Sequence, residues 1–120
     1  MNQFTRLAGD SANGVFVITP SPLPADSADP TFPDRYQDIS PGPQPRFLAV
    51  LAYDAANLLL EAIDQDIQSN QTPTRAGGES ALVQIDYTGL SGQFGFDAER
   101  DWGGAEGWVY QWQAGELVRP

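Results

Sequence analysis

The sequence contains neither cysteine nor histidine. Without cysteine, the chain forms no disulfide, no thiolate metal site and no cysteine nucleophile. Without histidine, it forms neither a Ser-His-Asp triad nor a histidine-ligated zinc site. These absences exclude most familiar hydrolase chemistry and leave only carboxylate chemistry open. We therefore expect a protein that is not an enzyme, with no metal and no cofactor.

Positive charge is also scarce. Lys and Arg together number 6, against 16 Asp and Glu, which gives a formal net charge of −10. Nucleic-acid phosphates and anionic lipid surfaces both attract clustered cations, so we expect neither a nucleic-acid partner nor a membrane-surface role. The acidic excess favours solubility.

Long apolar runs are missing as well. No segment reaches the roughly 20 apolar residues of a membrane-spanning helix. The first residues, MNQFTRLAGDSANG, lack the apolar core of a signal peptide. We therefore expect the chain, expressed alone, to remain in the cytoplasm, although a larger protein containing it can carry a signal elsewhere.

The sequence does contain enough apolar material for one small domain. Its 120 residues are 41% hydrophobic, which predicts a single domain over residues 1–120. Eight of its ten prolines fall between residues 20 and 45, and proline interrupts both helices and sheet ladders. We predict a long proline-rich loop over 20–45, in which FPDRYQD forms one or two helical turns.

The most regular pattern begins at Arg46, in RFLAVLAYDAANLLLEAI. Polar residues recur there at spacings of three and four, which places them on one face of a helix. We predict a long helix with Pro45 in its first turn and its end within Ser69–Pro73. Its apolar remainder requires cover from a sheet or a partner. The polar stripe predicted to face water consists of Asp54, Asn57, Glu61 and Asp64 or Gln65.

Shorter patterns precede and follow this helix. Residues 1–13 are poorly periodic and support at most a helical turn. GVFVITP, residues 14–20, predicts a buried strand that Pro20 terminates. TPTRAGG predicts a turn, and GESALVQIDY, residues 78–87, predicts a short helix.

The final third of the chain has a strand-like pattern. Phe94 and Phe96 alternate onto one face of GQFGFDA. Residues 108–118 alternate around the turn QAG, which is typical of a β-hairpin.

Two groups of carboxylates are candidates for reactive or metal-binding sites. Asp97, Glu99 and Asp101 have a spacing loosely compatible with a calcium loop, but they lack the EF-hand pattern. We interpret them as a solvated acidic turn. Asp64 and Asp66 do not face each other on a helix, because they are two positions apart. We expect both to be solvated.

The aromatic residues and the glycine-rich segment near the C-terminus also favour structural roles over ligand binding. The aromatic residues of the C-terminal third could stack a sugar or planar ligand, but large aromatic side chains more often form a core. GLSGQFG lacks the lysine and the following helix of a nucleotide-binding loop. The aromatic set consists of Trp102, Trp108, Tyr110, Trp112 and the nearby phenylalanines.

Four segments in order resemble one family. They are GVFVITP, then FPDRY with SPGPQP, then LAYDAANLLLEAI, and last YTGLSGQFGFDAERDW followed by VYQWQAGELV. Together they resemble the C-terminal portion of type I periplasmic substrate-binding proteins, the receptors of branched-chain amino acid transporters. The resemblance covers roughly residues 12–120. Arg100 departs from it, because the family usually has glycine at this position.

The resemblance implies an α/β fold that is only part of a two-lobed protein. We expect a partial type I periplasmic-binding fold with one long helix, a short helix and a C-terminal β-hairpin. The long helix would rest against a parallel sheet. The parent would be periplasmic or extracytoplasmic, would close its lobes around an amino-acid-like solute, and would deliver that solute to a membrane permease.

The resemblance also suggests ligand-binding residues. It implies that Tyr53 borders the ligand cleft and that Thr19 and Ser21, after the first strand, line the cleft or hinge. Asp54 is included in the site, although fixing the helix or a neighbouring loop is its more natural role. The helix pattern alone favours a structural role for Tyr53, because pockets need groups from several elements.

A second hypothesis comes from the apolar surfaces alone. A stand-alone chain of this kind can bury its sheet edge and helix by self-association, as a homodimer without a ligand.

Overall fold

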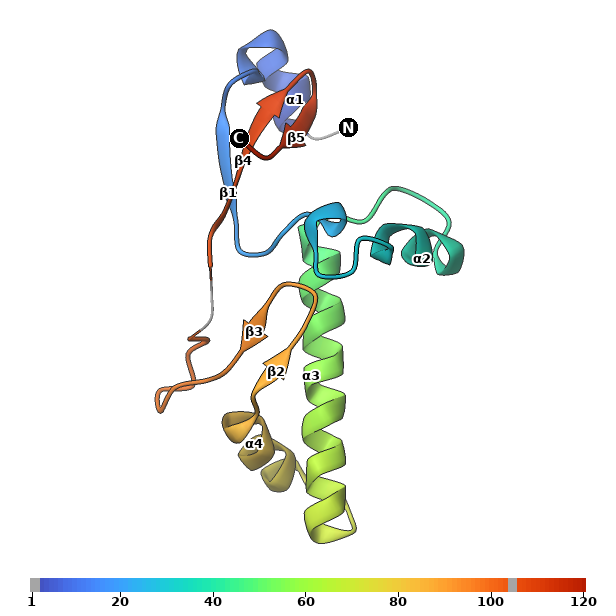
Figure 1. Cartoon of the computed structure of the whole chain (residues 1–120), viewed down its shortest axis with the longest axis vertical. Coiled ribbons are helices and arrows are strands. Elements are labelled where there is room, and N and C mark those ends of the chain that lie inside the picture. Colours follow the sequence, from blue (N-terminus) through green and yellow to red (C-terminus); the bar gives the residue numbers. More distant parts are fainter. Residues whose placement is uncertain (1–2, 104–105) are drawn as a thin grey trace. The chain divides into compact units, whose positions relative to one another are not determined.

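A computed structural model describes residues 3–103 and 106–120, and the chain divides into two compact units (Figure 1). One unit comprises Met1–Pro20 and Gly107–Pro120, and the other comprises Ser21–Glu106. The expectation of one domain over residues 1–120 stays a prediction. The long helix, the short helix and the C-terminal hairpin of the predicted fold are all present.

The first unit is a small antiparallel sheet with a helical segment. Its sheet has the order β1-β4-β5, and Ile18 on β1 lies opposite Val109 on β4. The N-terminal segment is more ordered than predicted, because the ring of Phe4 packs 6.2 Å from that of Trp112. The elements are α1 (Gln3–Ala8), the 3-10 helix η1 (Gly9–Ala12), β1 (Phe16–Thr19), β4 (Trp108–Gln113) and β5 (Glu116–Val118).

The predicted hairpin over residues 108–118 is confirmed. Tyr110 and Trp112 are buried on one face of β4, as expected for core aromatics. The turn uses Ala114 and Gly115 with φ of 50° and 88°, since two-residue hairpin turns of this kind require positive φ at both positions.

The predicted first strand forms, but only one of its faces is covered. It ends at Thr19, directly before Pro20, as expected. Phe16 and Ile18 are exposed on the opposite face of the sheet. The strand therefore differs from the buried strand that its sequence predicted.

The second unit is built around the long helix α3. Helix α4 turns back along the C-terminal half of α3, and the β2–β3 hairpin follows it (Figure 1). All strand ladders among the described residues are antiparallel, so the described part of the chain contains no parallel sheet for the long helix to rest against. The core of this unit is Leu58, Ala62, Ile85 and Phe94. The elements are η2 (Pro24–Asp26), α2 (Phe32–Ile39), α3 (Phe47–Asn70), α4 (Arg75–Gln84), β2 (Tyr87–Thr88) and β3 (Gln93–Phe94).

Helix α3 begins and ends close to where the sequence predicts. Arg46 is the extended residue before it, so Pro45 lies outside the helix rather than in its first turn. Gln71 ends it in the left-handed conformation, within the predicted Ser69–Pro73 segment. Among the described helices, none is both long and apolar enough to cross a bilayer.

The polar stripe predicted on α3 is partly wrong. Glu61 and Asp64 are exposed, in agreement with the prediction, whereas Asn57 and Gln65 are only partly exposed. Asp54 is fully buried instead, because it lies on the packed face of the helix. That face is one row at spacings of four, consisting of Val50, Asp54, Leu58, Ala62 and Asp66.

Helix α4 begins earlier than predicted. The side chain of Thr74 accepts a hydrogen bond of 2.9 Å from the backbone N–H of Gly77. This cap satisfies a donor at the helix start, so Arg75 through Gly78 form a helical turn. The predicted turn in TPTRAGG is therefore correct only as far as Thr74.

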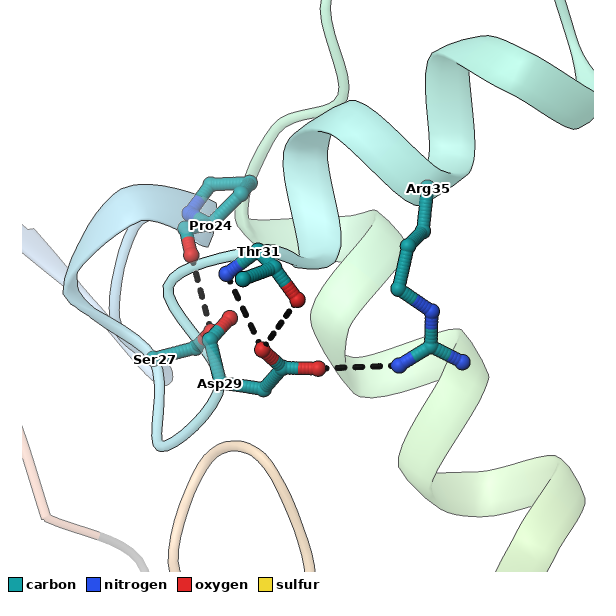
Figure 2. A network of polar contacts seen from close by, with 5 residues as sticks. All are labelled: Pro24, Ser27, Asp29, Thr31 and Arg35. Atoms are coloured by element: carbon teal, nitrogen blue, oxygen red, sulfur yellow. Dashed lines mark hydrogen bonds and ion pairs between the residues drawn. The ribbon is translucent and has the colours of Figure 1, made fainter.

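The proline-rich segment contains two short helices and an organised polar network. Asp29 Oδ1 accepts hydrogen bonds from the Thr31 backbone N–H and hydroxyl, and Asp29 Oδ2 accepts one of 2.9 Å from Arg35 (Figure 2). The Ser27 hydroxyl donates to the Pro24 carbonyl at 2.8 Å. These bonds hold the start of α2. The presence of this helix over Phe32–Ile39 confirms the helical turns predicted within FPDRYQD.

Candidate functional site

Tyr53 lies on α3 with its ring packed against α2. Its ring centroid is 5.3 Å from that of Phe32, with the planes at 65°, which is an edge-to-face pair. Phe32 is buried and also contacts Tyr36, whereas 39% of the Tyr53 surface is exposed. The Tyr53 ring is therefore packed against Phe32 and remains partly exposed.

Asp54 holds the β2–β3 turn against α3. Its carboxylate accepts hydrogen bonds from the Leu90 N–H at 2.7 Å, the Ser91 N–H at 2.8 Å and the Ser91 hydroxyl at 2.5 Å. A Cβ on Gly89 would lie 2.5 Å from the carboxylate carbon, so only glycine fits there. This geometry gives Asp54 the loop-fixing role.

Ser21 and the following loop meet the same region of the second unit. The buried Ser21 hydroxyl donates to the Phe47 carbonyl in the first turn of α3, at 3.0 Å. The Ala28 N–H donates to the Leu90 carbonyl at 3.0 Å, so the turn that Asp54 holds is also attached to the proline-rich segment. The segment after Ser21, the N-terminal half of α3 and the β2–β3 turn are distant in sequence and are thus connected to one another by hydrogen bonds.

Thr19 belongs to the other compact unit. It is buried at the end of β1, opposite Trp108 of β4. Three of the four predicted site residues, Ser21, Tyr53 and Asp54, are therefore in one unit, and Thr19 is in the other.

Asp66 makes a second carboxylate contact that the sequence interpretation missed. It is buried and accepts hydrogen bonds of 2.7 Å from the Thr74 N–H and from the Asn70 side chain. These bonds lower the pKa of the Asp66 carboxyl below its usual 3.8, and the bond from the Thr74 backbone has the largest effect. Asp64 is solvated as predicted, but Asp66 is not. Asp66 ends the row of buried residues on α3 that also contains Asp54.

Tyr87 on β2 adds to the electrostatics of this unit. Burial raises the pKa of its hydroxyl above the usual 10.0, and the charge of Asp54 raises it further. Tyr87 therefore remains a neutral phenol throughout the physiological range.

The acidic segment near Asp97 forms a self-contained turn. One Asp97 oxygen accepts the backbone N–H groups of Glu99 and Asp101, at 3.0 and 2.8 Å. Arg100 has a positive φ of 70°, a backbone conformation that favours glycine, the residue that the resemblance implies at this position. Within residues 3–103 and 106–120, no three acidic side chains gather as metal ligands.

A groove of about 810 Å³ lies between α3 and α4. We call it the α3–α4 groove, and none of the four predicted site residues lines it. Its walls are mainly apolar, and they also include Arg100 and Glu79, which form an ion pair. The apolar walls are formed by Leu59, Ala62, Ile63, Leu82, Val83 and Phe96.

Comparison with known families finds one match that spans nearly the whole chain. The model of the family described as periplasmic binding protein matches residues 2–116. A comparison with curated proteins finds no match.

Solved structures share the fold at low sequence identity. A leucine-binding protein, LivK, from Thermotoga maritima superposes with a TM-score of 0.76 at 22% identity, over 97% of this chain and 32% of its own. A substrate-binding protein from Desulfitobacterium hafniense, solved in complex with Leu, gives 0.72 at 21%, over 98% and 33%. A solute-binding protein from R. palustris, in complex with benzoate, gives 0.69 at 18%, over 98% and 32%. The chain thus has a partial periplasmic-binding fold, about a third the length of these proteins.

Proposed function

Since this chain belongs to the periplasmic binding protein family, we propose that it is the C-terminal third of a solute-binding protein for amino acids or similar small polar solutes. The observation that carries the proposal is the family match over residues 2–116. Solved relatives of the same fold include a leucine-binding protein and a complex with Leu. The full-length parent acts in the periplasm, performs no chemistry and passes its solute to a membrane permease.

The two compact units support a two-lobed parent. The chain passes from one unit to the other at Pro20–Ser21 and again at Glu106–Gly107. In our proposal each unit belongs to a different lobe, and these crossings lie in the hinge. Lobe closure about such a hinge encloses the solute.

Tyr53 is the proposed ligand-bordering residue of the second unit. Support comes from its partly exposed ring, fixed by Phe32. Asp54 and Ser21 are buried and bonded to backbone groups, so their proposed part is to shape the cleft edge. Thr19 has the corresponding part in the other unit.

The test is the solute affinity of Tyr53 variants in the full-length parent, by isothermal titration calorimetry with leucine and a panel of amino acids. We expect Tyr53→Ala to weaken binding by about tenfold or more. Tyr36→Ala is the matched control, because Tyr36 also contacts Phe32 but has no proposed ligand contact. Unchanged affinity in Tyr53→Ala, with a folded protein, would contradict the assignment.

Self-association without a ligand is the second candidate. The exposed Phe16 and Ile18 on β1, an edge strand of its sheet, favour it because open apolar edges attract further chains. Light scattering of the isolated chain over a range of concentrations tests this function. A monomer at all concentrations would exclude it.

A further inference from the structure

Asp29, in the segment before α2, accepts hydrogen bonds on all three of its oxygen atoms. Its backbone carbonyl accepts the N–H of Phe32 and the hydroxyl of Ser27, both at 3.0 Å. One carboxylate oxygen accepts the N–H and hydroxyl of Thr31, and the other accepts the guanidinium of Arg35 (Figure 2). The bonds from Thr31 are the main cause that lowers the pKa of the Asp29 carboxyl below its usual 3.8. Asp29 is therefore a carboxylate at neutral pH.

The polar network around Asp29 fixes a conformation more than it stabilises the chain. The side chain of Asp29 is 30% exposed and that of Arg35 is 61% exposed, and ion pairs between exposed side chains contribute little to folding stability. The bonds hold the backbone of residues 29–32, which enters α2 at its first residue, Phe32. Loss of the network therefore changes where Phe32 lies more than how stable the fold is.

Residues 28–32 connect two parts of the proposed cleft edge. At one end, the N–H of Ala28 donates to the Leu90 carbonyl in the β2–β3 turn, at 3.0 Å. At the other end, the buried ring of Phe32 packs edge to face with the ring of Tyr53, at 5.3 Å between centroids. Aromatic pairs have a preferred mutual geometry, so a displaced Phe32 changes the orientation of the Tyr53 ring.

We propose that Asp29 is a positioning residue for the solute site, because it fixes the backbone before α2, sets where the Phe32 ring lies, and through that ring orients Tyr53. The inference rests on the proposed function, in which Tyr53 borders the solute. In this proposal Asp29 does not contact the solute, since Thr31 and Arg35 already use its carboxylate oxygens. Its effect on solute binding therefore requires the Tyr53 ring.

The first experiment observes the Tyr53 ring in the 120-residue chain, with fluorotyrosine in place of its four tyrosines. The fluorine NMR signal of Tyr53 is the one that Tyr53→Phe removes. We expect Asp29→Ala to shift this signal by more than its line width, and Asp29→Asn, which keeps an acceptor for Thr31, to shift it less. Asp34→Ala is the matched control, because Asp34 is an exposed carboxylate of α2. A shift in Asp29→Ala no larger than that of the control would overturn the proposal.

The second experiment is a double-mutant cycle in the full-length parent, by titration with leucine or the tightest-binding amino acid of the panel. We expect Asp29→Ala to weaken binding by about threefold or more when Tyr53 is present, and to have no effect in the Tyr53→Ala background. A residue that acts through Tyr53 has no influence once that ring is absent. Equal losses in both backgrounds would overturn the proposal, because Asp29 would then act on the solute without Tyr53.

Thermal unfolding of the same variants separates positioning from a general loss of stability. We expect Asp29→Ala to lower the midpoint of the 120-residue chain by no more than about 5 °C. A larger fall would identify the network as a stabilising element and overturn the proposal. If the parent binds no amino acid, the proposed function is rejected. A shifted Tyr53 signal in Asp29→Ala would still show, in that case, that Asp29 positions the ring.

Discussion

At the residue scale, two buried carboxylates hold the second unit together. Asp54 and Asp66 lie on the packed face of α3, and each accepts backbone N–H groups from a segment that follows the helix. Charged hydrogen bonds of this kind contribute more than neutral ones, and unmet buried donors are costly. These carboxylates therefore connect α3 to α4 and to the β2–β3 turn.

Replacing Asp54 by alanine leaves two backbone donors and the Ser91 hydroxyl without their acceptor. We expect Asp54→Ala to lower the free energy of unfolding by about 3 kcal/mol or more, measured by urea denaturation followed by circular dichroism. Glu61→Gln, on the exposed side of the same helix, is the control, with an expected change within about 0.5 kcal/mol. Equal losses in the two variants would show that the Asp54 bonds contribute no stability.

Asp66 makes stability depend on acid pH. Its pKa is lower in the folded chain than the ordinary 3.8, so its contribution is complete above that ordinary value and is lost as pH falls through the folded value. We expect the difference in urea midpoint between the wild type and Asp66→Asn to be largest near neutral pH and to shrink below about pH 3.8. Asp64→Asn, at an exposed position of the same helix, is the matched control for the replacement of a carboxylate by an amide. A constant difference for Asp66→Asn at all pH values would reject the linkage.

At the element scale, the start of α4 depends on two neighbouring glycines with different surroundings. A Cβ on Gly77 would overlap the Asp66 carboxylate, whereas one on Gly78 meets nothing within 4 Å. The close approach of α4 to α3 explains why this segment is helical although its TPTRAGG sequence predicts a turn. Local sequence favoured a turn, and packing on Asp66 together with the Thr74 cap favoured the helix.

Alanine at these two positions should therefore have opposite effects. Gly78→Ala is expected to stabilise the chain by up to about 1 kcal/mol, the helix propensity difference. Gly77→Ala is expected to destabilise it by at least about 1 kcal/mol, because Asp66 must move away from its hydrogen-bond donors. Thermal unfolding of both variants beside the wild type measures the difference. A change of the same sign in both would mean that α4 does not approach Asp66 as closely as the structure shows.

At the scale of the whole molecule, this chain is about a third of the length of its solved relatives. A pocket needs convergent groups from several elements, and under the proposed function most of those elements lie outside this chain. Leucine and related amino acids should therefore leave the thermal midpoint of the isolated chain unchanged. The parent should be stabilised by about 2.7 kcal/mol at a solute concentration one hundred times Kd. A concentration-dependent rise in the midpoint of the isolated chain would show that a complete site survives in it.

The sequence by itself determined the long helix over its main span, the first strand, the C-terminal hairpin and the family. Periodicity and turn residues are local properties, so one sequence is enough to indicate the helix, the strand and the hairpin. The order of the four motifs indicated the family. The resemblance also implied glycine at the position of Arg100, and the positive φ of Arg100 is a conformation that glycine adopts readily.

Only the tertiary structure decided the roles of Asp54 and Asp66, the start of α4 and the open face of β1. These features depend on which segments meet after long stretches of chain, since the donors to Asp54 come from residues 90 and 91. A buried carboxylate and a solvated one have the same pattern in the sequence. The physical difference between them is the set of backbone N–H groups that folding brings to each.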